Sequence, residues 1–342
     1  MILIGYLYVR RHPRKLLRAY HYACAAKELG ADFMYFTLND VNYEKRQIHG
    51  YILVDGKWKR ANRPFPNVMI NAYVPKRHHS FRALYELLRL EIPCTTFWVG
   101  DKMMINNRLK KGGLFEKYII PSKKIDSVKD VFHFLEQYPK VVIKPLNSRQ
   151  GKNVYYIEKT TNSYIIEIDN KKQRYDYEQI SQIISEKLKE KQYLVQPYIN
   201  SKTRDGRSFD LRIHLIKNGD NKWVNTTTYA RISSSESIIS NIHHGGKRVP
   251  LDTFLQQEFP QDVEELTKEL KTFGLELAAH FEKQAHKEFD QLGIDVGIDE
   301  QKRFWLYEIN GRPGYPPSLF GKVGMEKNLI SYAIHLANKK DN

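Results

Sequence analysis

The stretch from residue 293 to residue 314 constrains the fold most, because its pattern predicts a β-hairpin that carries polar side chains on one strand. Apolar residues alternate over residues 293–299, and aromatic and branched residues fill residues 303–310. The polar run 299–302 between them suits a turn. The chain then breaks at the glycines and proline of residues 311–314. We therefore expect a hairpin whose second strand ends beside a loop.

Three side chains of this hairpin carry oxygen atoms that could form one cluster. Glu308 and Asn310 are two residues apart on one strand, so they share a face. A loop made of residues 299–302 places Asp295 opposite Leu306 and on that same face. Two carboxylates and an amide oxygen suit Mg²⁺, which fills its remaining positions with phosphate and water. The alternative is that these acidic residues are simply solvated on an exposed strand.

The length of 342 residues allows two or three domains and a sizeable core. Cys24 and Cys94 show neither a pairing pattern nor a metal spacing, which favours a reducing, cytoplasmic location. No apolar run approaches the length of a membrane span, so no membrane partner is expected. The apolar start over residues 1–9 is followed, not preceded, by charge, which predicts a buried first strand and not a signal peptide.

The formal net charge of +16 raises the question of a nucleic-acid partner. The basic residues are scattered, with the densest patches at residues 10–15 and 76–79. No predicted helix carries a continuous basic face with interleaved aromatic residues. The charge therefore favours a basic enzyme with an anionic substrate over a specific reader of DNA or RNA.

Residues 1–95 have the pattern of an α/β unit. It contains no GxGxxG and no P-loop, so it brings no phosphate-binding motif of its own. The expected order is a strand at 2–9, a helix at 14–29 ended by Gly30, a strand at 32–37, a hairpin at 50–54 and 57–60, a strand at 67–71 and a helix at 79–90.

A strand, a polar loop and a second strand follow two short helical stretches near residues 101 and 127–138. The first strand, 141–145, carries Lys144, the loop is 146–153, and the second strand is 154–158. Such a loop can fold backbone amides and a cation over a polyphosphate. An ordinary surface hairpin with lysines is the alternative.

The strand at residues 193–199 follows a helix at 176–191 and is interrupted by Pro197. A proline at that point leaves backbone polar groups unpaired in the ladder. An adenine edge could use those groups. A plain edge-strand proline explains the pattern equally well.

The strand at residues 209–215 has one polar and one apolar face. Asp210, Arg212 and His214 share the polar face, where the fork of Arg212 could hold a phosphate or carboxylate. Arg231, on a strand at 223–232, is a second candidate for the same anion. A solvated polar face is the alternative. Helices are expected at 261–289 and 326–338.

The order of these pieces resembles the ATP-grasp superfamily over about residues 95–325. Within it, the motifs Phe-Asp-Leu-Arg at 209–212, Ser-Asn-Ile-His-His-Gly-Gly at 240–246 and Trp-Leu-Tyr-Glu-Ile-Asn at 305–310 resemble the YheC/YheD-type family, which is associated by name with the coat of bacterial endospores. The resemblance implies an α/β (α+β) fold in which an N-terminal α/β domain precedes two α+β subdomains. The expected boundaries are 1–95 for the first domain, 96–192 for the small subdomain with the phosphate-covering loop, and 193–342 for the large subdomain with the metal site.

The resemblance also implies roles for individual residues, with ATP and Mg²⁺, or Mn²⁺ in its place, as cofactors. Lys102 and Lys144 match the lysines that hold ATP phosphates, Gly151 lies in the covering loop, and Gln196, Pro197, Tyr198 and Ile199 match the hinge that binds adenine. Asp295, Glu308 and Asn310 match the metal ligands, and Arg212 and Asn241 match positions near the transferred phosphate, with Arg231 as the second candidate for the same anion. The sequence departs from the family at the hinge, where a glutamate is common and Gln196 and Asn200 stand here. The ribose contact is therefore unassigned.

The implied activity is an ADP-forming ligase that joins a carboxylate to an amine through an acyl phosphate. Its partners would be small-molecule or peptide carboxylates and amines. A nucleotide-binding structural or regulatory protein of the spore coat, without turnover, is the alternative. The sequence leaves open the acid, the amine, the number of copies in the assembly, and whether the protein stays in the cytoplasm or joins the spore.

Overall fold

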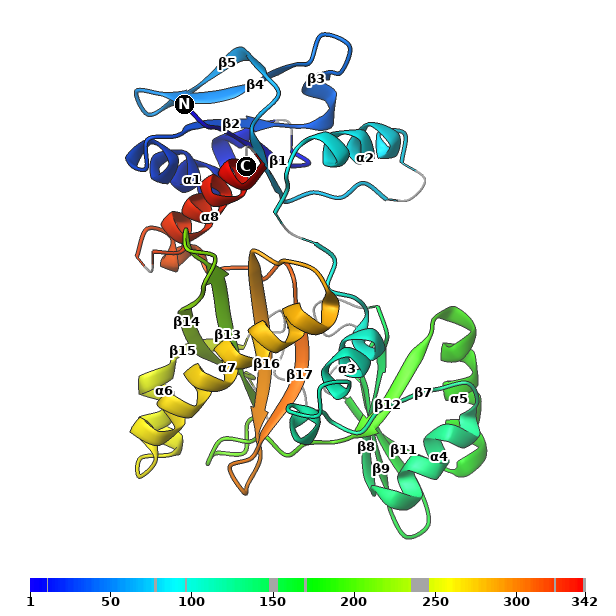
Figure 1. Cartoon of the computed structure of the whole chain (residues 1–342). Helices are drawn as coiled ribbons and strands as arrows, with labels where there is room; N and C mark the ends of the chain where they lie inside the picture. The colour runs from blue at the N-terminus through cyan, green and yellow to red at the C-terminus, as the bar shows by residue number, and fades with distance from the viewer. Residues whose placement is uncertain are drawn as a thin grey trace.

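The computed structural model describes residues 1–10, 12–76, 79–95, 97–147, 153–168, 171–234, 246–322 and 324–340. Within these residues, helices and three β-sheets form a mixed α/β fold (Figure 1). This confirms the predicted fold class.

The first sheet forms from the N-terminal part of the chain and has six strands. Its central strands run parallel, as the alternation of strands and helices in the sequence predicts. The order is β3 (Val41–Asn42), β4 (Gln47–Val54), β2 (Asp32–Phe36), β1 (Leu3–Leu7) and β6 (Val68–Asn71), and β5 (Lys57–Pro64) pairs with β4.

Helices cover both faces of this sheet. Tyr85 and Leu88 of α2 (Arg82–Glu91) pack into the apolar cluster on one face. The other face buries α1 (Leu17–Glu28) together with α8 (Met325–Lys340), the last helix of the chain (Figure 1). The C-terminal helix therefore packs with the first domain, although the expected boundary groups it with residues 193–342.

The second sheet, in the small subdomain, is antiparallel and has six strands. Helices α4 (Val128–Gln137) and α5 (Tyr177–Glu190) pack on one of its faces. Both begin at a capping box, which Ser127 and Asp176 form with residues three positions later. The strand order is β11 (Lys171–Tyr175), β10 (Tyr164–Ile168), β9 (Tyr155–Lys159), β8 (Lys140–Pro145), β12 (Tyr193–Pro197) and β7 (Lys123–Lys124).

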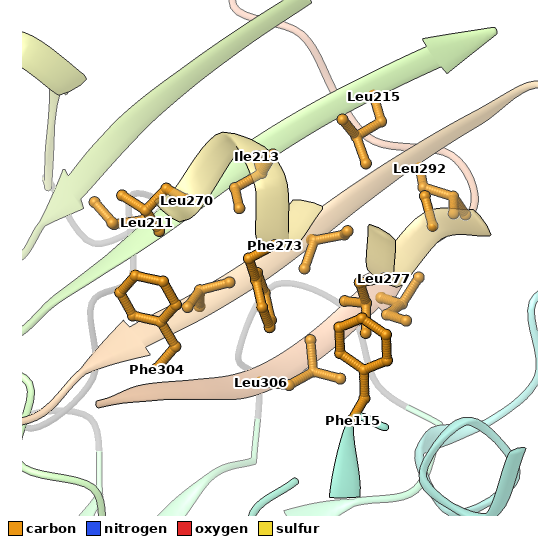
Figure 2. Close-up of a cluster of buried hydrophobic side chains, with 14 of the residues drawn as sticks. Phe115, Leu211, Ile213, Leu215, Leu270, Phe273, Leu277, Leu292, Phe304 and Leu306 are labelled. Atoms are coloured by element: carbon orange, nitrogen blue, oxygen red, sulfur yellow. The ribbon is translucent and has the colours of Figure 1, made fainter. Parts of the chain in front are cut away.

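The third sheet is antiparallel and forms the base of the large subdomain. Its order is β15 (Lys247–Pro250), β14 (Trp223–Ile232), β13 (Phe209–Lys217), β16 (Gln291–Ile298) and β17 (Phe304–Asn310). The apolar face of these strands packs against α6 (Leu251–Glu258) and α7 (Val263–Ala285). Figure 2 shows Leu270, Phe273 and Leu277 of α7 against this face. Helix α3 (Lys102–Lys110) adds Ile105 and Leu109 to this same core, so it packs with the large subdomain although it lies in the segment 96–192.

Most expected elements are present, with shifted ends. The predicted helix at 14–29 is split by Leu16 into a 3₁₀ turn, Pro13–Lys15, and α1. The helix expected at 261–289 ends at Ala285, because His286 takes a left-handed conformation. Strands β3, β7, β10, β11 and β15 and helix α6 were not expected from the sequence. In the described segments, no helix combines the length and apolar character needed to cross a membrane.

Candidate functional site

The polar face of the third sheet brings together five of the predicted site residues, which are Arg212, Arg231, Asp295, Glu308 and Asn310. Arg212 of β13 pairs in register with Asp295 of β16, and Asp295 pairs with Glu308 of β17. On the other side, Asp210 of β13 pairs with Arg231 of β14. Directly opposed residues point to the same face, so four strands contribute to one cluster. The opposite face of these strands is the apolar core of Figure 2.

The register of the hairpin differs from the prediction. Asp295 was expected opposite Leu306, which is wrong: Ile298 pairs with Phe304, so the loop is one residue longer than expected. The register then shifts once more between Val296 and Asp295, where β17 has an extra residue and bulges. The two shifts add up to two residues, so the side chains that follow the bulge in β17 point to the faces that were predicted for them. Asp295 therefore still shares a face with Glu308.

The bulge also explains how Leu306 and Glu308 reach opposite faces. In a regular strand, residues two apart share a face, so both would point the same way. Leu306 is 5 % exposed and packs in the core with Phe304, as Figure 2 shows. Glu308 instead lies on the polar face beside Asp295. The extra residue in β17 is therefore what presents Glu308 to the site.

Asp295 is held by two arginines and an amide. Arg212 donates to both of its carboxylate oxygens, with Nη2 at 2.8 Å from Oδ2. Arg231 Nη2 lies 3.0 Å from Oδ2, and Asn310 Nδ2 lies 3.3 Å from the same oxygen. Burial raises the pKa of Asp295, but Arg212 and Arg231 outweigh it and the pKa falls to about 2.

Arg231 joins this cluster to β13 by a second ion pair. Its Nε donates to Asp210 Oδ1, while its Nη2 faces Asp295. Burial lowers the pKa of Arg231, but Asp210 and Asp295 outweigh it, so the pKa is raised. Arg212 and Arg231 are therefore cations fixed in place by carboxylates on their own sheet.

Lys102 approaches Glu308 from the start of α3. Its Nζ lies 3.1 Å from Glu308 Oε1. Asp101 caps this helix, because its side chain accepts a hydrogen bond of 2.9 Å from the backbone N–H of Met104. The cap holds the first turn of α3 in place. Lys102, the residue after the cap, points from this turn to the end of β17.

Lys144 reaches the same place from the small subdomain. Its Nζ lies 3.4 Å from the backbone oxygen of Tyr307, the residue at the bulge. Burial lowers the pKa of Lys144 to about 8, and the charge of Lys102 acts in the same direction, while Glu308 and Asp295 partly oppose them. Lys144 is half-buried, and among the described residues no carboxylate lies within ion-pair distance of its ammonium, so it is suited to bind an anion.

A pocket of about 330 Å³, a volume that includes open solvent at its mouth, lies where these elements meet. Four predicted residues line it: Lys102, Lys144, Gln196 and Glu308. The other lining residues come from α3, the segment before β7, β12 and β17, and sequence reasoning did not assign them to the site, although those of β17 lie in the motif at 305–310. These are Ile105, Asn106, Ile120, Ser122, Leu194, Leu306, Tyr307 and Ile309.

The edge of β12 beside this pocket has backbone groups that do not bond to β8. Tyr198 N donates to Lys140 O at 2.9 Å, and in an antiparallel ladder only every second pair is bonded in this way. The C=O of Pro197 and the N–H of Ile199 therefore point away from β8. Strand β7 covers this edge only at Leu194 and Val195. One acceptor and one donor thus follow each other along this edge.

The oxygen cluster fits a magnesium ion by its chemistry. Glu308 has a side chain 32 % exposed, and Asn310 points its amide nitrogen to Asp295, which leaves its oxygen for a ligand. Asp295 Oδ1 accepts from Arg212, so it keeps one lone pair. Mg²⁺ binds through one or two carboxylates plus phosphate and water, and this donor set can supply that. Among the described residues, no group of three or more His, Cys, Asp or Glu side chains forms a metal site.

Two predicted site residues, Gly151 and Asn241, lie outside the described residues. The strands on either side of the predicted covering loop, β8 and β9, do pair antiparallel as expected.

Comparison with known proteins identifies the family. The sequence model for YheC/D-like ATP-grasp proteins matches residues 91–336. The chain belongs to this family. The family resemblance drawn from the motifs of β13 and β17 is thereby confirmed.

Two relatives come from Bacillus subtilis (strain 168). The chain is 24 % identical to the endospore coat-associated protein YheD, over 92 % of this chain and 72 % of the relative. It is 21 % identical to the endospore coat-associated protein YheC, over 92 % of this chain and 89 % of the relative.

Solved ATP-grasp structures share the fold at low identity. The D-alanyl-alanine synthetase A of Vibrio cholerae has a TM-score of 0.58 at 11 % identity and covers 99 % of this chain and 98 % of its own. A RiPP-associated ATP-grasp ligase of Chryseobacterium gregarium, bound to ADP and to a leader and core peptide, has a TM-score of 0.54 at 14 % identity and covers 99 % of this chain and 97 % of its own. The D-alanine-D-alanine ligase of Coxiella burnetii has a TM-score of 0.57 at 11 % identity and covers 100 % of this chain and 97 % of its own.

Proposed function

We propose that the protein is an ATP-dependent ligase that joins a carboxylate to an amine and forms ADP. One observation carries the proposal: Lys102, Lys144 and Glu308 line the same pocket as the edge of β12. A nucleotide with its base at β12 and its outer phosphates at the lysines would lie along this pocket. Arg212 would then stand beside the terminal phosphate, on the neighbouring strands.

The chemistry needs positioning and positive charge, and no protein nucleophile. An oxygen of the substrate carboxylate attacks the γ-phosphorus, the bond to the β-phosphate oxygen breaks, and ADP leaves. The amine then attacks the acyl carbon, phosphate leaves with its bonding electrons, and the amine loses a proton. Lys102, Lys144 and Arg212 would stabilise the negative charge that shifts onto the phosphate oxygens.

Glu308, Asn310 and Asp295 would hold Mg²⁺, with Mn²⁺ as a substitute. Held by these residues, Mg²⁺ would supply positive charge that neutralises part of the charge on the phosphates. Pro197 O would accept from an adenine amino group and Ile199 N would donate to the ring, while Gln196 lines the pocket beneath. Gly151 in the covering loop, and Asn241 and Arg231 near the transferred phosphate, complete the proposed set.

The class of substrates rests on the names of the structural neighbours. The ligases of Coxiella burnetii and Vibrio cholerae are named for joining D-alanine units, and the Chryseobacterium gregarium ligase was solved with ADP and a peptide. Amino-acid or peptide carboxylates and amines are therefore the substrates to try. The names of the Bacillus subtilis relatives support a location at the spore.

A second function is favoured by those same names and by the ion pairs of Asp295. A coat-associated protein could bind nucleotide for a structural or regulatory purpose without turnover. Asp295 is engaged by Arg212 and Arg231, which reduces its capacity to bind a metal.

The deciding experiment is to incubate the full chain with Mg·ATP and a panel of carboxylate and amine pairs, and then to separate nucleotides and products. Ligated product formed in step with ADP and phosphate supports the ligase. AMP formed in step with product would refute the acyl phosphate route. AMP is the product of adenylation, in which the bond between the α- and β-phosphates breaks and pyrophosphate leaves. ADP without ligated product, or tight nucleotide binding without turnover, would favour the second function.

A further inference from the structure

The outer edge of β5 pairs with no strand among the described residues. Strand β4 covers the other edge of β5 along its whole length, and within the described part of the chain no isolated bridge or backbone hydrogen bond reaches the outer edge. The hairpin of β4 and β5 lies at the end of the first domain that is farthest from the other two sheets (Figure 1). An unpaired strand edge presents a row of backbone donors and acceptors to which another extended chain can pair.

The turn of this hairpin decides which backbone groups of β5 point outward. Asp55 and Gly56 have positive φ angles of 49° and 71°, as in the two-residue type I′ turn of a β-hairpin. The residues that flank such a turn, here Val54 and Lys57, exchange both hydrogen bonds. Along an antiparallel pair, these bonded pairs alternate with pairs whose N–H and C=O groups point away from each other. Every second residue of β5 from Trp58 onward therefore turns its backbone groups to the open edge.

Two features of β5 agree with this assignment. The outward-facing residues are Trp58, Arg60, Asn62 and Pro64. Pro64 has no N–H, and a proline is tolerated where the N–H would not bond to the neighbouring strand. Arg63 Nη1 reaches the C=O of Asn62 from the open side, at 3.4 Å from the oxygen. Within the described residues, the N–H groups of Trp58, Arg60 and Asn62 have no partner.

The side chains of β5 are basic, and those on one face have no carboxylate partner in the described part of the chain. The strand contains no acidic residue. Lys57, Lys59 and Arg63 are spaced by two and four residues, so they share a face, and both lysines are exposed. Arg60, on the other face, is different, because its Nη1 lies 2.8 Å from Asp40 Oδ1. The open edge is therefore flanked by cations whose charge the described residues leave uncompensated.

These charges decide between a second copy of the chain and an acidic partner. Two copies that paired through this edge would bring like charges opposite one another across the new ladder, which destabilises a sheet. Lysine on an edge strand is a common means of preventing such pairing. The same cations attract a strand that carries carboxylates at the matching positions. An acidic chain is therefore the occupant that this edge fits.

We propose that the outer edge of β5 binds an extended acidic segment of a polypeptide, which pairs antiparallel with β5 and carries a carboxylate at every second residue. The carboxylates lie opposite Lys57, Lys59 and Arg63, in pairs without hydrogen bonds, where the side chains of facing strands approach most closely. The residues between them exchange backbone hydrogen bonds with the outward-facing residues of β5. The backbone bonds give affinity and the alternate carboxylates give specificity. This binding does not rest on the proposed ligase function.

The first test is calorimetry on the full chain with three capped peptides of equal length. Glu alternates with Thr in the first peptide, the same residues are arranged with all Glu at one end in the second, and Lys replaces Glu in the third. The wild-type protein should bind the alternating peptide at least about threefold more tightly than its isomer, because only alternation places the carboxylates on one face, and it should not bind the Lys peptide. Equal affinity for the two isomers would refute strand pairing. A wild type that binds none of the peptides would also refute the proposal and would show that the cations serve only to keep copies apart.

Arg60→Pro tests the backbone of the edge. The substitution removes an N–H that points outward and leaves the hydrogen bonds to β4 in place. Arg60→Ala is the matched control, because it removes the same side chain and its ion pair with Asp40 but keeps the N–H. The proline variant should bind the alternating peptide about threefold or more weakly than the alanine variant, because one hydrogen bond is lost. Equal affinity in the two variants would contradict pairing at β5.

N-methylated peptides keep the proposal testable if Arg60→Pro does not fold. In the antiparallel arrangement the Thr amides face β5 and the Glu amides face away. Methyl groups on the Thr amides should therefore abolish binding, and methyl groups on the Glu amides should preserve it. Any other pattern would refute antiparallel pairing.

Lys59→Gln tests the charge on the edge. It should weaken binding of the alternating peptide by about twofold to fivefold, whereas Lys27→Gln, which removes an exposed lysine from α1, should bind like the wild type. Equal loss in both variants would show attraction to the domain as a whole and overturn the site. A further titration adds Mg·ATP to the wild-type complex. Displacement of the peptide would place it at the pocket of Lys102 and Lys144 and not at β5.

Discussion

Lys102 Nζ lies 3.1 Å from Glu308 Oε1, which joins the start of α3 to the end of β17. The two residues come from elements far apart in sequence, yet they line one pocket with Lys144. The charge of Glu308, which pairs with Lys102 and lines the same pocket as Lys144, partly offsets the repulsion between the two lysines before an anion arrives. Glu308 would therefore organise the phosphate-binding cations as well as serve as a metal ligand.

Glu308→Gln should keep the fold and weaken the binding of Mg·ATP by about tenfold or more. The substitution removes a charge with little change of shape, so Lys102 loses its ion pair and the proposed metal site would lose a charged ligand. Calorimetry with and without Mg²⁺ measures the effect. Glu190→Gln is the control, because Glu190 forms a similar ion pair with Lys187, at 3.0 Å, on α5. Equal Mg·ATP affinity in Glu308→Gln and the control would remove Glu308 from the site.

The affinity for Mg·ATP should fall as the pH rises through about 8. The pKa of Lys144 is lowered to about 8 by burial and by Lys102, so in the free protein its ammonium loses its proton near this pH. A polyphosphate binds the charged form, and above this pH binding must take up a proton. The phosphates of ATP are already ionised there, since their last pKa is near 6. Calorimetry between about pH 7 and about pH 9.5 follows the change.

Lys144→Met supplies the comparison for this pH series. Its affinity should be lower at neutral pH and nearly constant across the range. A wild-type affinity that stays constant from neutral to alkaline pH would contradict the assignment of Lys144 to the phosphates.

Asp295→Asn should lower the free energy of unfolding by about 3–5 kcal/mol at neutral pH. The change removes the carboxylate that Arg212 faces and leaves Arg231 with Asp210 alone, and removing one partner of a buried ion pair has this effect. Chemical denaturation measures it. Asp220→Asn, in the turn between β13 and β14, serves as the control and should change stability little.

The same carboxylate predicts a sensitivity to acid. The pKa of Asp295 is lowered from 3.8 to about 2, so its contribution to stability is present above about pH 4 and is lost as the pH falls toward 2. Asp295→Asn should therefore lose less stability than the wild type over that interval. An equal loss of stability in both proteins would show that the arginines do not lower the pKa of Asp295 in the folded state.

The strands and their faces follow from the sequence because alternation is a local signal. Asp210, Arg212 and His214 share a face at spacing two, and the structure keeps them together on β13. The partners of Asp295 could not be predicted in this way, because Arg212 is 83 residues away and the pairing of β13 with β16 is a tertiary event. The packing of α8 against the first sheet is non-local for the same reason.

The bulge in β17 is indicated in the sequence by a change in the spacing of its core residues. Phe304 and Leu306 are two apart, but the next core residue, Ile309, is three further on. A step of three in an apolar strand indicates one extra residue, and Tyr307 fills that role. The polar face gave no comparable sign, because Trp305 and Tyr307 suit either face.

The edge of β12 should select ATP over GTP by at least about tenfold. Pro197 C=O and Ile199 N–H point away from β8, so the edge offers an acceptor followed by a donor. Adenine presents an amino donor and a ring-nitrogen acceptor and so matches both groups, whereas guanine presents an oxygen acceptor and a ring N–H donor and opposes both.

Because these contacts use backbone atoms, Gln196→Ala should lower the affinity for both nucleotides without reversing the preference. Competition between Mg·ATP and Mg·GTP for the full chain measures the ratio. Equal affinity for the two would place the base elsewhere than at β12.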